Sequence, residues 1–249
     1  GLTGRDDDVN TWVIVNDLQI PWHDQPVLNL VLNFVKELRP HGVILNGDVV
    51  DCYDLSDFDR NPMKDYGLNR EIDASGKLMA ALVPVTKERW WLGGNHEDRF
   101  RRMLWRNPHL AKVRALRFPA IFHLGDYGFQ WKPYGGFLTL GKLMVTHGSQ
   151  VLKHSGQTAR AHFEKYGTSI LIGHTHRQGI YYRRNIRGVH AAYENGCLCR
   201  LDPEYVQAPD WQQGFSVVHV DPKGWFNVQQ IPILQRRRFF YGPDLVGKR

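Results

Sequence analysis

Short apolar runs rich in β-branched residues alternate with longer amphipathic stretches in the first hundred residues. Three such runs end in polar residues and are typical of buried strands: 13–15, 43–45 and 90–92. Between the first two, apolar residues recur at helical spacing from Val27 to Leu38, and Pro40 stops the pattern. This order predicts a β-α-β unit with a right-handed crossover.

The alternation continues along the rest of the chain. It predicts helices at 75–86 and 158–166 and further strands at 143–146, 170–172, 189–193, 215–220 and 225–230. Residues 52–75 and 107–140 show little periodicity, and we expect loop insertions there. Without an internal repeat or linker, the sequence predicts a single α/β domain over residues 1–249, with a flexible N-terminus at 1–10 and C-terminal strands and a tail at 197–249.

Composition narrows the class of protein. The chain has 249 residues, 42% of them hydrophobic, which is enough for a substantial core. Its apolar runs are too short to cross a membrane, and we expect no membrane contact. Three cysteines are too few for a disulfide framework, and no signal pattern opens the chain, so we expect a cytoplasmic protein. The oligomeric state is left open.

Polar side chains capable of binding metals follow five of the predicted strands. They occur in five short segments: Asp17-Leu18-Gln19, Gly47-Asp48-Val49-Val50-Asp51, Gly94-Asn95-His96-Glu97, Thr146-His147-Gly148 and Gly173-His174-Thr175-His176. In open α/β sheets, ligands bind at the carboxyl ends of the strands, so these segments should converge. Any one of them alone is an ordinary turn. Together they offer carboxylates, amide oxygens and imidazoles that suit two cations about 3.5–4 Å apart.

The ordered series D-x-(H/Q), G-D-x-x-D, G-N-H-E, H-G and G-H-x-H resembles the calcineurin-like metallophosphoesterases, and it spans Asp17 to His176. The resemblance implies an α/β fold, a four-layered αββα sandwich of two mixed β-sheets, with a dinuclear metal site at the C-terminal ends of the strands. The segments 195–198 and 211–215 are similar to the phage and bacterial branch of that superfamily.

The resemblance also assigns roles. Asp48 would bridge both ions, Asp17, Gln19 and His176 would complete the first site, and Asn95, His147 and His174 would complete the second. His96 would protonate the leaving group or stabilise the phosphoryl charge. Asp51 would accept a hydrogen bond from His96, although an aspartate here also suits an ordinary helix N-terminus.

Gln19 departs from the family pattern, in which most members carry His at this position. An amide oxygen is a harder ligand than imidazole, so we favour Mn²⁺, with Mg²⁺, Fe and Zn²⁺ as alternatives. The same D-x-Q variation occurs in a manganese-dependent branch of nucleoside diphosphate-linked pyrophosphatases. Cys197 and Cys199 lie outside the five segments, and we expect them to pack in the core.

The formal net charge of +7 favours an anionic partner. Seven bases and no acid lie between residues 99 and 117, and the run begins three residues after His96. Arg99 and Arg102 are therefore candidates for binding a phosphate at the rim of the metal site.

The sequence predicts a hydrolase: a metal-dependent phosphoesterase that cleaves phosphodiester or phosphomonoester bonds in DNA, RNA or nucleotides by means of a metal-activated water. Two alternatives stay open. One is the nucleoside diphosphate-linked pyrophosphatase, and the other is a non-catalytic binding subunit built on the same fold.

Overall fold

The computed structural model describes residues 8–57, 67–203, 208–235 and 237–247, so most of the segment 1–10 that was predicted to be flexible lies outside it. The larger sheet has six strands in the order β11-β10-β1-β2-β3-β4. β1 to β4 run parallel, and β10 and β11 are antiparallel to their neighbours. The bounds are β1 (Asn10–Val15), β2 (Gly42–Asn46), β3 (Glu88–Leu92), β4 (Gln130–Lys132), β10 (Gly214–Val220) and β11 (Phe226–Pro232).

The second sheet has five strands in the order β5-β6-β7-β9-β8. β6, β7 and β9 run parallel, while β5 and β8 are antiparallel edge strands. The bounds are β5 (Phe137–Leu140), β6 (Leu143–Thr146), β7 (Ile170–Ile172), β8 (Gly179–Asn185) and β9 (Gly188–Glu194). A two-stranded ribbon, β12 (Phe239–Tyr241) and β13 (Asp244–Val246), lies near the C-terminus.

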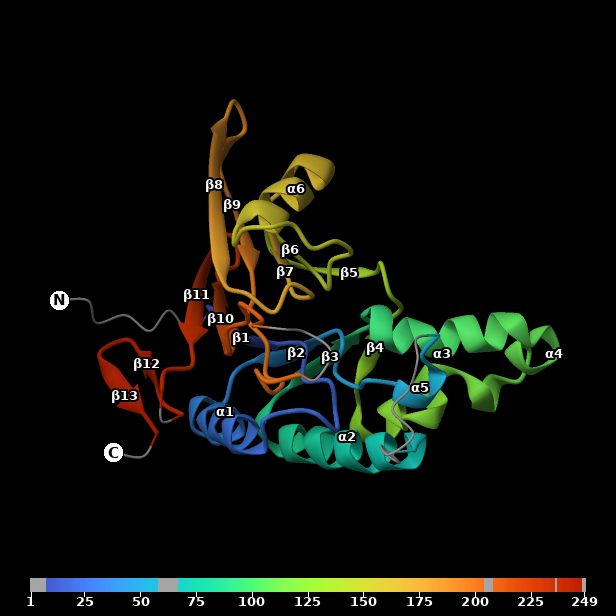
Figure 1. The fold of residues 1–249 in the computed structure, drawn as a ribbon. Coiled ribbons are helices and arrows are strands. Elements are labelled where there is room, and N and C mark those ends of the chain that lie inside the picture. The colour runs from blue at the N-terminus through green and yellow to red at the C-terminus, as the bar shows by residue number, and fades with distance from the viewer. Residues whose placement is uncertain (1–7, 58–66, 204–207, 236, 248–249) are drawn as a thin grey trace.

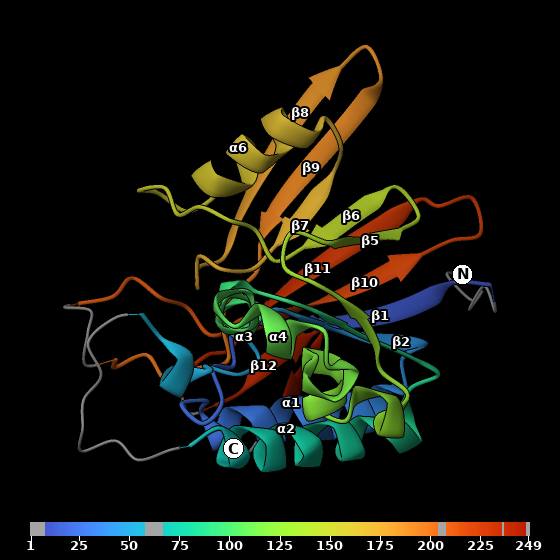
Figure 2. The same cartoon turned by 90° about the vertical axis from the view of Figure 1, so that its right-hand side faces the viewer.

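Helices cover the outer face of each sheet. α1 (Gln25–Leu38) and α2 (Leu68–Leu82) lie under the larger sheet, and α6 (Gln157–Tyr166) covers the second (Figures 1 and 2). α3 (Asn95–Arg106) follows β3 directly and leads to the short helices α4 (Pro108–Ala111) and α5 (Phe118–Ile121). This arrangement confirms the predicted αββα sandwich of two mixed sheets.

The alternation of side chains along β1 explains the layering. Val13 and Val15 pack into the cluster that contains α1, whereas Trp12 and Ile14 pack against the second sheet. Because both faces are covered, the strand reads as a continuous apolar run. Burying each large aliphatic side chain contributes about 1.5–3 kcal/mol, so this strand anchors both layers.

Several elements differ from the sequence expectations. α2 begins at Leu68 rather than near 75, within a stretch that was expected to be a loop. The sequence did not reveal its first turns, because the buried Glu71 interrupts the apolar face of the helix. β8 was not predicted, because most of its side chains are exposed on an edge strand. The region 107–140 holds short helices and strands that depend on tertiary packing rather than on their own periodicity. In the described part of the chain, no helix is both long and apolar enough to cross a membrane.

Candidate metal centre

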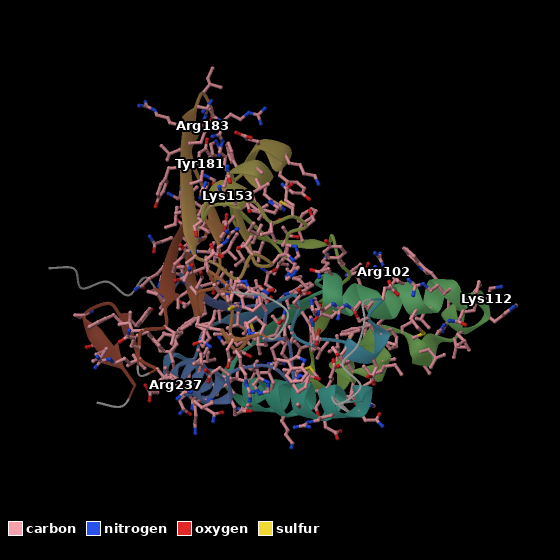
Figure 3. All side chains as sticks on the ribbon, viewed as in Figure 1. Arg102, Lys112, Lys153, Tyr181, Arg183 and Arg237 are labelled. Atoms are coloured by element: carbon pink, nitrogen blue, oxygen red, sulfur yellow. The ribbon has the colours of Figure 1, made fainter. Side chains whose placement is uncertain are left out.

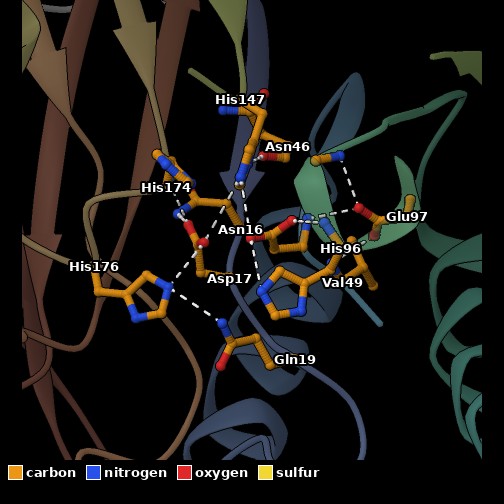
Figure 4. Close-up of polar contacts among 12 residues, drawn as sticks. Asn16, Asp17, Gln19, Asn46, Val49, His96, Glu97, His147, His174 and His176 are labelled. Atoms are coloured by element: carbon orange, nitrogen blue, oxygen red, sulfur yellow. Dashed lines mark hydrogen bonds and ion pairs between the residues drawn. The ribbon is translucent and has the colours of Figure 1, made fainter. Parts of the chain in front are cut away.

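The carboxyl ends of five strands bring the five predicted segments together (Figure 4). Asp17 follows β1, Asp48 follows β2, Asn95 follows β3, His147 follows β6, and His174 with His176 follows β7. The side chains of Asp17, Asp48 and His147 are almost completely buried. One ligand atom from each of Asp48, His147 and His174 lies within 4.8 Å of the others, a spacing suited to a metal ion.

Most of these residues adopt a left-handed backbone conformation. The angle φ is 52° at Asp17, 50° at Gln19, 49° at Asp48, 69° at His174 and 57° at His176. Non-glycine residues pay about 1–3 kcal/mol for such a conformation, and it persists only where surrounding contacts enforce it. Five such residues at one place indicate that this strained backbone serves to orient their side chains toward a common point.

Glu97 provides part of that enforcement. Its carboxylate accepts hydrogen bonds from the backbone N–H groups of Asp48 (3.0 Å), Val49 (2.8 Å) and Gly94 (2.7 Å). Gly94 is required here, because a Cβ atom would lie 2.1 Å from Oδ1 of Asp48. The buried glutamate therefore joins the turn that follows β2 to the first turn of α3.

The carboxylate of Asp17 is held in one orientation. Its Oδ2 accepts hydrogen bonds from Asn16 Nδ2 (2.5 Å) and from the backbone N–H of His174 (2.9 Å). Its buried Oδ1 has no hydrogen-bond donor and lies 3.1 Å from Nε2 of His176. Asn16 in turn contacts Asn195, whose amide donates to the backbone of β1. Oδ1 of Asp17 is thereby left directed toward His176 and the other proposed ligands.

His147 is held in the tautomer that metal binding requires. Its Nδ1 donates to the backbone carbonyl of Asn46 (2.8 Å), so Nε2 is directed toward Oδ2 of Asp48 (3.2 Å). Oδ1 of Asn95 is buried without a hydrogen-bond partner, and buried Nε2 of His147 faces only the carboxylates of Asp48 and Asp17. Buried polar atoms are normally satisfied, and a divalent cation would satisfy these two together with Oδ1 of Asp17. The residues present therefore fit a metal centre.

The surroundings of the site shift the pKa values of His147 and His174 in opposite directions. Burial opposes protonation of His147, but Asp48 and Asp17 outweigh it and raise its pKa to about 10. Burial and the nearby His147 lower the pKa of His174 to about 4, so this ring is neutral and able to bind a cation. The amide of Gln19 lies 3.4 Å from Nε2 of His176, and rotating the amide would present its oxygen there.

His96 and Asp51 form a hydrogen-bonded pair beside these residues. Nδ1 of His96 lies 2.6 Å from Oδ1 of Asp51, and Nε2 lies 3.7 Å from Oδ2 of Asp48. Burial opposes the charged ring, but the two carboxylates outweigh it and raise the pKa of His96 to about 9. Trp22 donates to the other oxygen of Asp51 at 2.8 Å. In the metal-free protein, these contacts therefore orient the ring of His96 and favour its protonated form.

The two arginines of the predicted phosphate site lie on α3. Nη1 of Arg99 lies 3.1 Å from Oδ1 of Asp51 and donates to its backbone carbonyl, so this guanidinium supports the His96 pair. Arg102 is more exposed and pairs with Asp98 and Asp57, each at 3.6 Å. Neither arginine lies in the group of metal-binding atoms.

Sequence reasoning missed one supporting carboxylate. Glu71 on α2 is buried and accepts hydrogen bonds from the backbone N–H groups of Cys52 (2.7 Å) and Tyr53 (3.2 Å). Burial raises its pKa to about 8. It fixes the segment that immediately follows Asp51. An acidic residue at a position where the helix faces the core was the available signal.

The fold and the arrangement of the five segments agree with the resemblance of the sequence to the calcineurin-like metallophosphoesterases. A model of the calcineurin-like phosphoesterase family matches residues 11–201, and the chain belongs to this family.

Individual relatives are more distant. The chain is 26% identical over 226 residues to the Gene 54 protein of Mycobacterium phage D29, and the matched region covers 84% of this chain and 88% of that protein. Among solved structures, it is similar to Vacuolar Protein Sorting 29 from Cryptosporidium parvum, with a TM-score of 0.48, 14% identity and coverage of 91% and 98% of the two chains. The nuclease MPE from Pseudomonas putida gives a TM-score of 0.40 and 13% identity, with coverage of 88% of this chain and 86% of that chain.

Proposed function

We propose that this protein is a phosphodiesterase with two divalent ions at the ends of its strands. In this proposal Asp48 bridges the ions, Asp17, Gln19 and His176 complete the first site, and Asn95, His147 and His174 complete the second. The observation that carries the proposal is the convergence of buried ligand atoms at strained backbone positions: Oδ1 of Asn95 has no hydrogen-bond partner, and Oδ1 of Asp17 and Nε2 of His147 face only other members of the proposed ligand set. Family membership supports it.

The donor set favours Mn²⁺. Two aspartates and two side-chain amides contribute oxygen atoms, which bind Mn²⁺ and Mg²⁺ better than softer ions, while the imidazoles retain a preference for transition metals. Gln19 is the distinguishing residue, because His at that position would shift the first site toward Zn²⁺.

Bound cations would activate a water molecule and neutralise charge on the phosphoryl oxygens. The chain itself supplies the proton for the leaving group. His96 holds that proton on Nε2, because Nδ1 is committed to Asp51 at 2.6 Å. Asp51, oriented by Trp22 and Arg99, keeps the ring in position. A positioned general acid of this kind accelerates cleavage most when the leaving group is a poor one, such as the sugar oxygen of a nucleic acid.

A basic arm that starts near the site supports a polynucleotide substrate. The β8–β9 hairpin begins three residues after His176, and its seven-residue strands are each about 20 Å long. The inner part of β9 pairs with β7, and the outer part of the hairpin projects beyond the amino end of β7 (Figures 1 and 3). Its outer half carries three exposed arginines: Arg183, Arg184 and Arg187. The side chain of Tyr182 is 65% exposed among them, and residues 179–193 contain no acid. Exposed bases with an aromatic ring suit a phosphate backbone and its bases.

Hydrolysis of bis-p-nitrophenyl phosphate and p-nitrophenyl phosphate in the presence of Mn²⁺ tests the proposed activity. We expect turnover of the diester that requires the metal and disappears in Asp48→Ala. Turnover of the monoester alone would show a phosphomonoesterase instead. Absence of turnover on both substrates, in a protein that binds two ions, would favour the non-catalytic binding subunit.

The salt dependence of nucleic acid binding tests the proposed substrate. In R183A/R184A/R187A we expect weaker binding of single-stranded DNA or RNA and a slope of log K against log salt that is reduced by about 0.7–0.9 for each lost phosphate contact. Turnover of the small diester should not change. The matched control, K36A/K77A/K87A, removes the same charge from exposed positions on or beside other elements and should keep the slope. Cleavage restricted to nucleoside diphosphate-linked compounds, with no salt effect of the arm, would favour the pyrophosphatase.

A further inference from the structure

A second group of potential metal ligands lies behind His176. The thiols of Cys197 and Cys199 and one ring nitrogen of His176 lie within 4.8 Å of one another, and all three residues are buried. Both cysteines are free thiols. The group is separate from Asp48, His147 and His174, which form their own cluster.

The ring of His176 faces both clusters with different nitrogens. Nε2 lies 3.1 Å from Oδ1 of Asp17, and Nδ1 lies 3.8 Å from Sγ of Cys199. The indole of Trp211 packs edge-on against the ring, with centroids 4.2 Å apart, and restrains its rotation. The imidazole therefore stands between an oxygen-rich set and a sulfur-rich set.

The backbone holds the two thiols in place. The N–H of Cys199 donates to the carbonyl of Asp17 (3.0 Å), and the N–H of Cys197 donates to that of Gln212 (3.0 Å). Gly214 donates back to the carbonyl of Cys197 at the same distance. The thiol pair is thus fixed to the strand end that carries Asp17, so little rearrangement is needed to bring both sulfur atoms to one ion.

We propose that Cys197, Cys199 and Nδ1 of His176 bind a thiophilic divalent cation such as Zn²⁺. Two sulfur ligands and one imidazole are an established zinc donor set, with a fourth position for water. Metal–ligand bonds of about 2.0–2.3 Å place tetrahedral donors roughly 3.5–3.8 Å apart, so the present group need contract only slightly. Each thiol releases its proton to solvent on binding, and His176 does the same at Nδ1, so its ring is an imidazolate when both sites are filled. The proposed dinuclear centre shares His176 with this site but does not depend on it.

Cys52 shows what a buried cysteine without this function looks like. It is as buried as Cys197, but it lies outside both groups of potential metal ligands that the described residues form. It is therefore the matched control for the loss of a buried thiol.

Absorption spectroscopy of the reduced, full-length protein loaded with Co²⁺ tests the proposal. Sulfur ligands give Co²⁺ an intense charge-transfer band in the near ultraviolet that oxygen and nitrogen ligands do not give. We expect the band in the wild type and in Cys52→Ser, its loss in C197S/C199S, and one Co²⁺ fewer per chain in that double variant. A folded wild type without the band, or a band that persists in the double variant, would overturn the proposal.

Two further measurements test the thiol site by other means. The first measures the effect of Zn²⁺ on stability, and the second separates the thiol site from the proposed dinuclear centre. Zn²⁺ in excess should raise the melting temperature of the wild type above that of C197S/C199S, because an ion that binds only the folded state stabilises it. Equal shifts would count against the site. Asp48→Asn should abolish diester hydrolysis and keep the band, and loss of the band there would contradict a separate site. A wild type that hydrolyses the diester without ever showing the band would refute the thiol site alone.

Discussion

Replacement of Glu97 by Gln should destabilise the protein and weaken its metal centre together. Oε2 of Glu97 accepts the backbone N–H groups of Asp48 and Gly94, and Oε1 accepts that of Val49 and the indole N–H of Trp91. An amide has only one oxygen. In either orientation its NH₂ group therefore faces at least two buried donors that lose their acceptor.

Each buried donor left unsatisfied costs about 1–3 kcal/mol, so we expect Glu97→Gln to lower the free energy of unfolding by about 2–6 kcal/mol. The same two turns carry Asp48 and Asn95. Loss of a supporting contact of this kind typically lowers metal affinity about 10–100-fold.

Urea denaturation of the metal-free protein at pH 8 and calorimetric titration with Mn²⁺ measure the two effects. Glu164→Gln is the matched control: Glu164 is exposed on α6 and pairs with Arg160 at 2.8 Å, so its loss should cost at most about 1 kcal/mol. A Glu97→Gln protein as stable as this control, with unchanged Mn²⁺ affinity, would refute the role given to Glu97.

Three other substitutions test separate parts of the site. Gln19→His should raise the affinity for Zn²⁺ relative to Mn²⁺ in competitive titrations, and an unchanged ratio would show that Gln19 is not a ligand. His96→Ala should retain bound metal but reduce turnover about 10²–10⁴-fold on a diester with a poor leaving group and far less on the bis-p-nitrophenyl ester, whereas equal losses would contradict a general acid. Glu71→Gln tests pH dependence: burial raises the pKa of Glu71 from 4.5 to about 8, so the folded wild type binds the extra proton and loses stability as pH rises through that interval. The Glu71→Gln variant has no group at this position that ionises between pH 4.5 and 8. Its unfolding free energy, relative to that of the wild type, should therefore rise by at most on the order of 5 kcal/mol over that interval. Parallel melting curves of the two proteins would refute the raised pKa of Glu71.

The layers of the fold and the five polar segments at the strand ends were predictable because they depend on short-range patterns. The part of β1 that is buried on both faces, Trp12 to Val15, is apolar throughout, and the polar residues that follow it stand out against that background. The parallel order then places the ends of β1, β2 and β3 at one edge of the sheet. The exposed edge strand β8 carries no such pattern, and the buried Glu71 concealed the first turns of α2.

Partners across the site were beyond the reach of the sequence. The pairing of Arg99 with Asp51 joins positions 48 residues apart, and the basic run alone suggested a phosphate ligand for Arg99. The left-handed conformations at Asp17 and Asp48 are imposed by tertiary contacts rather than by residue type. The approach of Cys199 to His176 depends on the segment after β9 returning to the end of β1.

The most direct test of the proposed function is a Mn²⁺ titration of the metal-free protein in which electron paramagnetic resonance and hydrolysis of bis-p-nitrophenyl phosphate are followed in the same samples. Two ions bridged by Asp48 predict that turnover rises together with a spin-coupled dimanganese signal, and that both are lost in Asp48→Asn. Full turnover without added metal, or at a stage when only isolated Mn²⁺ ions are detected, would contradict the dinuclear mechanism.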